Sequence, residues 1–431
     1  MSRRPNPVDP GASPLHLFGA ALRRMRGDVP LTRVGKEILT DWSRIARWER
    51  GECLPHADSV RRLDEFFHAG GFLIALHGAV TELERLRATS GKPDQDKGEF
   101  MERRQLLQLA IASLGMGALG GAADEPVRRL LDLAMNGEPR SVEDWHLACA
   151  DHLHALRTRP PAQVAADLLI DLMAVRHQME ASTPDDITEL HRVTAALASV
   201  HANALTRLGE HGAALRWWRT ARQAADASGD LRLRLLVRGE EAGHGLYGQR
   251  DPQTVLGLVE SAERIAGRPT VDLLTTRAKA LTILGRHDEA RTALDDLLGL
   301  ASAGVTADSF GFWSPNQIHF AESWVHAGAG DDSEADRARE DVLRSTRDYQ
   351  YNANVRLHEA LCTVVQGGVD QGISQAAIVI DRLAPAYRSH HIIETGRMVL
   401  RAVPHDQQDR PAVGELRELL ALAPARTSRS G

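Results

Sequence analysis

Two arginines three residues apart, Arg44 and Arg47, carry the clearest recognition chemistry in this chain. If residues 42–49 form a helix, both guanidinium groups project from one face. A guanidinium can donate paired hydrogen bonds to guanine edges or phosphate oxygens. Beside them, Ser43 can contact base or backbone and Trp42 can cover a thymine methyl. These residue types at this spacing favour binding of double-stranded DNA over a merely solvated charged face.

The surrounding residues predict the helix that must position these side chains. Asp41 is a good N-cap, and Gly51 suits the position just beyond the helix end. Ile45 and Trp48 lie three apart on an apolar face, so we expect Trp48 to belong to the core.

A second short helix is predicted immediately upstream. Pro30 can open it, Val34 and Ile38 form its apolar stripe, and Gly35 is a small residue where another helix must approach closely. Two short helices joined by about three residues form a helix-turn-helix.

The segment from Val34 to Gly51, followed by Pro55, resembles the phage-repressor (Xre) type of helix-turn-helix. The resemblance implies a preceding helix, which residues 15–26 supply, and major-groove contacts from positions 42, 43, 44 and 47. We add Thr32 and Arg33, at the start of the motif's first helix, to the predicted DNA contacts. The resemblance therefore implies a DNA-binding domain over residues 14–88.

The charge distribution agrees with a protein that meets DNA at one end. Residues 1–51 hold ten Lys or Arg against five Asp or Glu, a net charge of +5. Because the whole 431-residue chain carries −6, the remainder carries −11. An acidic body excludes a general nucleic-acid-binding surface and leaves the basic head as the candidate.

Cysteine usage and the N-terminus predict a cytoplasmic protein. The three cysteines, Cys53, Cys149 and Cys362, are far apart and show no metal-type spacing, which fits a reducing compartment. Residues 1–13 are proline-rich and contain no charged-then-apolar leader, so we expect a disordered arm. A disordered tail is likewise predicted for residues 423–431.

Residues 89–124 are interpreted as a linker and connecting helix. Residues 90–98 are polar and rich in helix breakers. Arg103-Arg104 and the uncharged run 105–123 resemble a twin-arginine export signal, but they lie far inside the chain. We favour a buried connecting helix over a membrane contact or a targeting signal, and expect no stable membrane insertion, because the run contains two Gln and four Gly.

A repeated pattern dominates residues 125–422. The stretch Leu208–Ala214 recurs as Leu284–Ala290, 76 residues later, with Leu-Gly, His and Ala at matching positions. Related stretches begin at Tyr247, near half that interval, and at Gly330 and Gly368. A period near 38 residues predicts a solenoid of antiparallel helix pairs, and the units resemble degenerate tetratricopeptide repeats. The predicted fold is therefore all-α, an N-terminal helix-turn-helix bundle followed by this α-solenoid.

The groove of such a solenoid is the predicted ligand site. Aromatic residues are rare overall but gather in residues 310–324, and a polar aromatic patch follows at 349–356. The alternative for Phe320 and Trp324 is an ordinary core role. In regulators that join these two domains, asparagines often hold a peptide backbone, so the resemblance implies a role for Asn352 or Asn354. Our candidate ligand-binding residues are Trp313, Asn316, Tyr351, Asn352 and Asn354.

No catalytic or cofactor motif is present in the sequence. His146, Cys149 and His152 follow one another in steps of three, which drift too far around a helix to converge on one metal ion. No phosphate-binding loop, zinc-protease pair or nucleophile elbow occurs. We therefore expect a protein that is not an enzyme and needs no cofactor.

The leading functional hypothesis is a cytoplasmic transcriptional regulator, acting as a homodimer, whose repeat domain binds a peptide, a small ligand or a protein and controls DNA binding. The alternative is an adaptor or anti-activator that acts through protein binding alone, and a third reading is a membrane-associated scaffold. The combination of domains, with only four lysines among 52 basic residues, resembles regulators common in actinobacteria.

Overall fold

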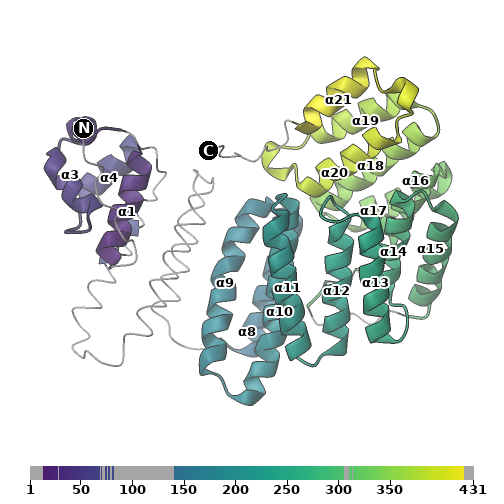
Figure 1. Ribbon diagram of the computed structural model, residues 1–431, viewed down its shortest axis with the longest axis horizontal. Helices are drawn as coiled ribbons and strands as arrows, with labels where there is room; N and C mark the ends of the chain where they lie inside the picture. Colours follow the sequence, from purple (N-terminus) through teal and green to yellow (C-terminus); the bar gives the residue numbers. More distant parts are fainter. Residues whose placement is uncertain are drawn as a thin grey trace. The chain divides into compact units, whose positions relative to one another are not determined.

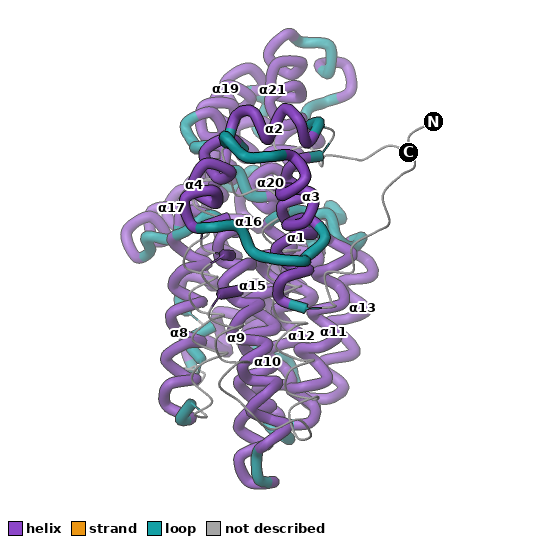
Figure 2. The backbone as a smooth tube through the Cα atoms, turned by 90° about the vertical axis from the view of Figure 1, so that its left-hand side faces the viewer, coloured by secondary structure: helices purple, strands orange, loops and turns teal. Residues whose placement is uncertain are grey.

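The computed structural model describes residues 13–81, apart from 28, 68, 70–72, 75 and 78–79, and residues 140–421, apart from 305–309 and 313. The chain divides into two compact units, residues 1–139 and 140–431. All regular elements in the described ranges are helices, without any strand, which confirms the all-α prediction (Figure 2). None of the described helices combines the length and apolar character that a membrane span requires.

Several sequence-based predictions fall outside these ranges. They are the arm up to residue 12, the linker and connecting helix at 89–124, with its run 105–123, and the tail at 423–431. The arm's last residue, Ser13, is described: its hydroxyl accepts a hydrogen bond from the backbone N–H of His16 and caps the first helix.

The helices described with their bounds in the N-terminal unit are α1 (Pro14–Arg26), α2 (Leu31–Glu37), α3 (Trp42–Glu49) and α4 (Ala57–Phe66). They enclose an apolar core that includes Phe18, Leu22, Ile38, Ile45 and Leu63. Two glycines allow the backbones to approach closely. A Cβ on Gly19 would lie 2.5 Å from the carbonyl oxygen of Trp48, and one on Gly35 would lie 2.5 Å from that of Thr40.

The predicted helix signals at α2 and α3 are confirmed. The Asp41 carboxylate accepts a hydrogen bond from the N–H of Ser43 at 2.8 Å, and Pro30 occupies the N-cap of α2. Gly51, two residues after α3 ends, has φ 70°, the left-handed conformation that favours glycine. Between the two helices Leu39 adopts φ 55°, a strained value for leucine, and is 79% exposed.

The C-terminal unit is a succession of helices, each packed on its neighbours in the chain, and the even-numbered helices α8 to α20 also pack on one another (Figure 1). In chain order they are α8 (Val142–Thr158), α9 (Pro161–Ala181), α10 (Pro184–Arg207), α11 (His211–Ala227), α12 (Leu231–Gly245), α13 (Pro252–Ala266), α14 (Val271–Ile283), α15 (His287–Ser302), α16 (Asn316–Ala329), α17 (Asp332–Ser345), α18 (Tyr349–Val365), α19 (Val369–Asp381), α20 (His390–Ala402) and α21 (Pro411–Ala421), with short 3-10 turns η1 (Pro385–Tyr387) and η2 (His405–Gln407).

The repeated sequence pattern marks the turns within the helix pairs. Gly209 and Gly285 have φ 75° and 72°, and each follows the last residues of an even-numbered helix. The N–H of the next residue bonds back to a carbonyl five residues earlier, at 2.9 Å in both turns, which satisfies a helix-end acceptor. Gly330 and Gly367 repeat this arrangement. In the last copy the turn glycine is Gly367, one residue before the Gly368 at which the sequence pattern begins this copy.

The two ends of this unit meet. Helix α10 contacts α20, α8 contacts α18, and α9 contacts η1. The Arg157 guanidinium donates to the carbonyl of Gly311 at 3.1 Å, and the Tyr387 hydroxyl donates to that of Thr158 at 3.4 Å. The succession of helices is therefore curved enough to enclose a space between the even-numbered helices.

Candidate functional site

Helix α3 separates a buried apolar face from an exposed polar one. Ile45 and Trp48 are buried, as predicted for Trp48, whereas Trp42 is 52% exposed. The other predicted DNA contacts are exposed too: Thr32, Arg33, Ser43, Arg44 and Arg47. The structure places all six on α2 and α3 at the surface of the N-terminal unit.

The two arginines of α3 differ in their partners. The Arg47 guanidinium lies 3.1 Å from Glu52, which also pairs with Arg50 at 2.6 Å. Hydrogen bonds from Arg50 and then from Arg47 lower the pKa of the Glu52 carboxyl. Because exposed ion pairs are weak, Arg47 can exchange this carboxylate for another anion. Arg44 forms no ion pair within the described residues.

A buried ion pair fixes the end of α3. Glu49 is only 5% exposed, and its carboxylate accepts two hydrogen bonds from Arg26 of α1, at 2.5 and 3.0 Å. Arg26 also donates to the carbonyls of Gly27 and Val29. This pair could not be predicted from the sequence, because the two residues are 23 positions apart and no local pattern links them.

The C-terminal unit encloses a cavity of about 320 Å³ between its even-numbered helices. Each of these helices from α8 to α20 contributes to the lining, as do the segments before α16 and α18. Ser345 and Arg347, which belong to the lining, are exposed, so the cavity reaches the surface there. This space is the candidate ligand site.

Two of the five predicted ligand-binding residues line the cavity, Asn316 and Tyr351. Asn352 and Asn354 lie on α18 outside the lining, and Trp313 lies outside the described residues, although its neighbours Phe312 and Ser314 line the cavity. Asn354 is fully buried, and neither of its amide atoms has a hydrogen-bond partner among the described residues.

The sequence left open whether Phe320 and Trp324 of α16 belong to the core or to the ligand site. Phe320 and Trp324 are both buried in the apolar core shared with α18. Phe320 also lines the cavity and stacks on Tyr351, with ring centroids 4.8 Å apart.

The cavity wall is rich in charged groups. Its cations are Arg157, Arg207, Lys279 and Arg347, and its carboxylates are Glu240, Asp272 and Asp348. Burial lowers the pKa of Lys279 to about 8. Burial also raises the pKa of Asp348, whose carboxylate caps α18 by accepting from the N–H of Gln350 at 2.8 Å. Sequence reasoning had singled out none of these residues, because they come from helices far apart in the chain.

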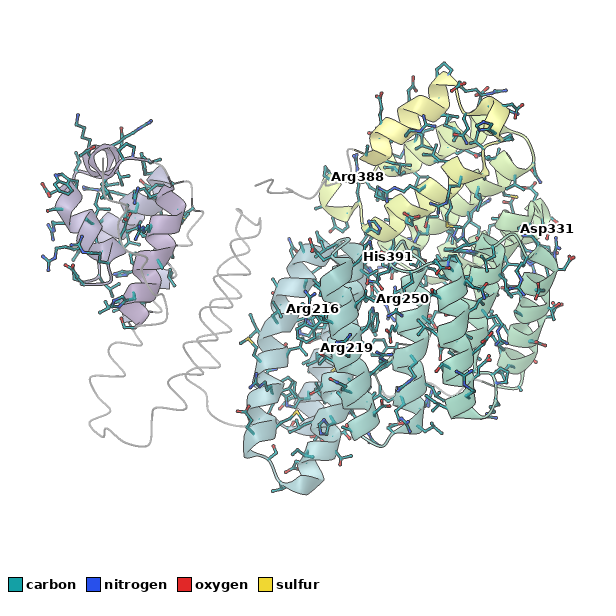
Figure 3. The ribbon with its side chains drawn as sticks, viewed as in Figure 1. Arg216, Arg219, Arg250, Asp331, Arg388 and His391 are labelled. Atoms are coloured by element: carbon teal, nitrogen blue, oxygen red, sulfur yellow. The ribbon has the colours of Figure 1, made fainter. Side chains whose placement is uncertain are left out.

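A chain of polar side chains borders the cavity where α20 meets α12. His391, labelled in Figure 3, lies 2.9 Å from His244, whose other ring nitrogen contacts Asn203 at 2.9 Å. Burial holds the pKa of His391 well below its usual value, so this ring is neutral. These hydrogen bonds tie α10, α12 and α20 together around the cavity.

The three residues weighed as metal ligands have separate surroundings. His146 contacts Glu189 at 2.8 Å and His152 contacts Asp171 at 2.6 Å. Cys149 is buried, which raises the pKa of its thiol. No group of three or more metal-ligating side chains is found within the described ranges.

Comparisons with protein-family models, with curated proteins and with solved structures find no match for this chain. The function proposed below accordingly rests on the contacts and charges of its own residues.

Proposed function

We propose that this protein is a sequence-specific transcriptional regulator that binds double-stranded DNA through α2 and α3. In this proposal the two helices form an Xre-type helix-turn-helix, with α3 as the recognition helix in the major groove. The helix pairs of the C-terminal unit form a tetratricopeptide-like solenoid that binds a ligand and controls DNA binding.

The observation that carries the proposal is the division of α3 into two faces. Ile45 and Trp48 anchor it in the core, while Arg44, Arg47 and Trp42 project from it into solvent. The backbone contact at Gly35 and the buried Arg26–Glu49 pair hold α3 rigidly against its neighbours. A rigid helix with exposed cations supports groove binding, because specificity requires side chains held in a fixed register.

We further propose that a homodimer acts in the cytoplasm. One small DNA-binding unit binds weakly, so two units on paired half-sites are needed for affinity. The solenoid would set the distance between the two units, and a ligand that alters its curvature would alter that distance.

The test is selection of the purified full chain on a pool of genomic DNA fragments at two salt concentrations. We compare the wild type with Arg44→Ala/Arg47→Ala. The matched control is Arg176→Ala/Arg268→Ala, two exposed arginines of the C-terminal unit that remove the same charge. We expect the first variant to lose at least about tenfold in affinity for the enriched sequence, since good arginine contacts with bases are worth ~1–3 kcal/mol each.

Equal enrichment by all three proteins would contradict DNA recognition by α3. The protein would then act as the adaptor or anti-activator considered above, and the search would turn to proteins that bind the solenoid.

A further inference from the structure

We propose that the cavity of the C-terminal unit binds a small organic anion, carrying a carboxylate or phosphate group, and that Lys279 is the cation that contacts this group. This inference specifies the ligand class for the proposed function, and any role of the ligand in regulation rests on that function. It can be tested without DNA.

The surroundings of Lys279 are the main evidence for this site. This lysine lies on α14 with 9% of its surface exposed, and it belongs to the cavity lining. Its ammonium lies 5.8 Å from the ring centroids of both Phe320 and Trp324. It forms no ion pair or hydrogen bond with the described residues. A buried ammonium without a counter-ion is costly, so a ligand that supplies a negative charge would relieve that cost.

Three arginines add to this positive character. Arg157, Arg207 and Arg347 line the same cavity, and none of them forms an ion pair within the described part of the chain. Arg207 is buried, and two of its nitrogens donate to the Asn203 side chain at 2.9 Å and the Leu156 carbonyl at 2.6 Å. By contrast, the half-buried Arg250 is paired with a carboxylate, that of the buried Glu241, at 2.7 Å.

The carboxylates of the lining do not replace the missing counter-ion. Burial has the largest effect on the pKa of Lys279 and lowers it, whereas the charge of Glu240 has a smaller effect that raises it. The Glu240 carboxylate oxygen lies 3.1 Å from the His244 ring and forms no ion pair with the ammonium within the described residues. Asp348 is turned toward the backbone of its own helix. Asp272 lies on α14 too, seven residues before Lys279.

The remaining lining suits a small molecule with a polar end. Thr275, Thr276 and Gln317 offer neutral hydrogen-bonding groups near the cations, and Phe320 offers an apolar surface for a carbon skeleton. The volume of about 320 Å³ falls at the lower end of small-molecule sites.

Pyridoxal 5′-phosphate is a direct probe, because it carries both a phosphate and an aldehyde. The Lys279 amine adds to the aldehyde carbon and water leaves, giving an imine, which borohydride then reduces to a stable secondary amine. The full chain has only four lysines, Lys36, Lys92, Lys97 and Lys279, so peptide mass mapping assigns each label unambiguously. Lys36, exposed on α2, is the internal control.

We expect Lys279 to be labelled at least about tenfold faster by pyridoxal 5′-phosphate than by uncharged pyridoxal, because the phosphate is attracted to the cations of the lining. Lys36 should show a much smaller difference. Saturating succinate or inorganic phosphate should protect Lys279 but not Lys36. The stronger protector identifies whether the natural group is a carboxylate or a phosphate.

A second measurement, of melting temperature, shows whether the Lys279→Gln variant remains folded. The melting temperature of the wild type should rise with the protecting anion, and Lys279→Gln should melt cooperatively without that rise. Equal labelling of Lys279 by the two aldehydes, or no labelling of Lys279 while Lys36 reacts, would overturn the proposal. Neither result depends on DNA binding, so failure here is distinct from failure of the Arg44 and Arg47 experiment.

Discussion

A single carboxylate, that of Glu49, links the end of α3 to α1 through two hydrogen bonds from Arg26. Removing one member of a buried pair leaves the other charge uncompensated. We predict that Glu49→Ala destabilises the N-terminal unit by about 3 kcal/mol or more, measured by urea denaturation. Arg26→Met/Glu49→Leu, which removes both charges, should recover most of this loss. If the single and double variants were equally unstable, the pair would not fix α3 as described.

A buried histidine makes the C-terminal unit sensitive to acid. Burial, with a smaller effect of the Lys279 charge, lowers the pKa of His358 to about 3. Between pH 6.5 and about 3 the unfolded histidine binds a proton that the folded one does not, so stability rises with pH across this window. The stabilisation is complete above pH 6.5 and falls as the pH is lowered.

We predict that the wild type loses about 2 kcal/mol at pH 5 through His358 alone. The His358 Nδ1 lies 3.0 Å from the Ser323 hydroxyl, and glutamine is chosen because its amide can also form a hydrogen bond. Calorimetry from pH 7.5 to 5 on the wild type and on His358→Gln should show a shallower pH dependence for the variant. Burial also lowers the pKa of the buried His201 and of the half-buried His390, so part of the pH dependence remains in the variant. Identical slopes for the two proteins would exclude this role of His358.

At the scale of elements, glycine turns end the first helix of several pairs. Gly285 has φ 72° with no atom within 4 Å of a Cβ added to it, whereas Gly257, in the middle of α13, has the same free space in helical conformation. Gly285→Ala should therefore destabilise by about 1 kcal/mol through backbone strain alone. Gly257→Ala should stabilise by about 0.5–1 kcal/mol. Thermal denaturation of the two variants measures both changes in stability. If Gly285→Ala were more stable than the wild type, the left-handed conformation at Gly285 would be contradicted.

Local signals in the sequence were sufficient to predict where several of these helices begin and end. Asp41, Gly51 and the repeated Leu-Gly turns act on their own few neighbours, so their types and spacing predicted helix ends that the structure confirms. The cavity could not be predicted in this way. In the sequence Lys279 is one more polar residue in a helical pattern, and only the packing of the whole stack brings it to the same cavity as Arg157 and Asp348. The asparagines of α18 were chosen by resemblance, and the burial of Asn354 depends on packing that no local pattern encodes.

The whole molecule consists of two units with separate apolar cores. We predict that residues 140–421 alone unfold with the same midpoint as the corresponding transition of the full chain, because the two large apolar clusters described for this unit consist of residues within that range. Differential scanning calorimetry of the two proteins measures this. A shift of more than about 5 °C would indicate stabilising contacts between the units, since ~1 kcal/mol moves the midpoint of a domain by a few degrees.

The return of α20 to α10, and of η1 to α9, changes how the helix stack can come apart. In an open array of repeats each unit touches only its neighbours, so the terminal units fray first. Here the hydrogen bond between Tyr387 and Thr158 joins residues 229 positions apart, and each end supports the other. The outermost amide hydrogens should then exchange with solvent almost as slowly as those in the middle. A ligand in the enclosed space would slow exchange at both ends at once, which would make the stack respond to it as a single body.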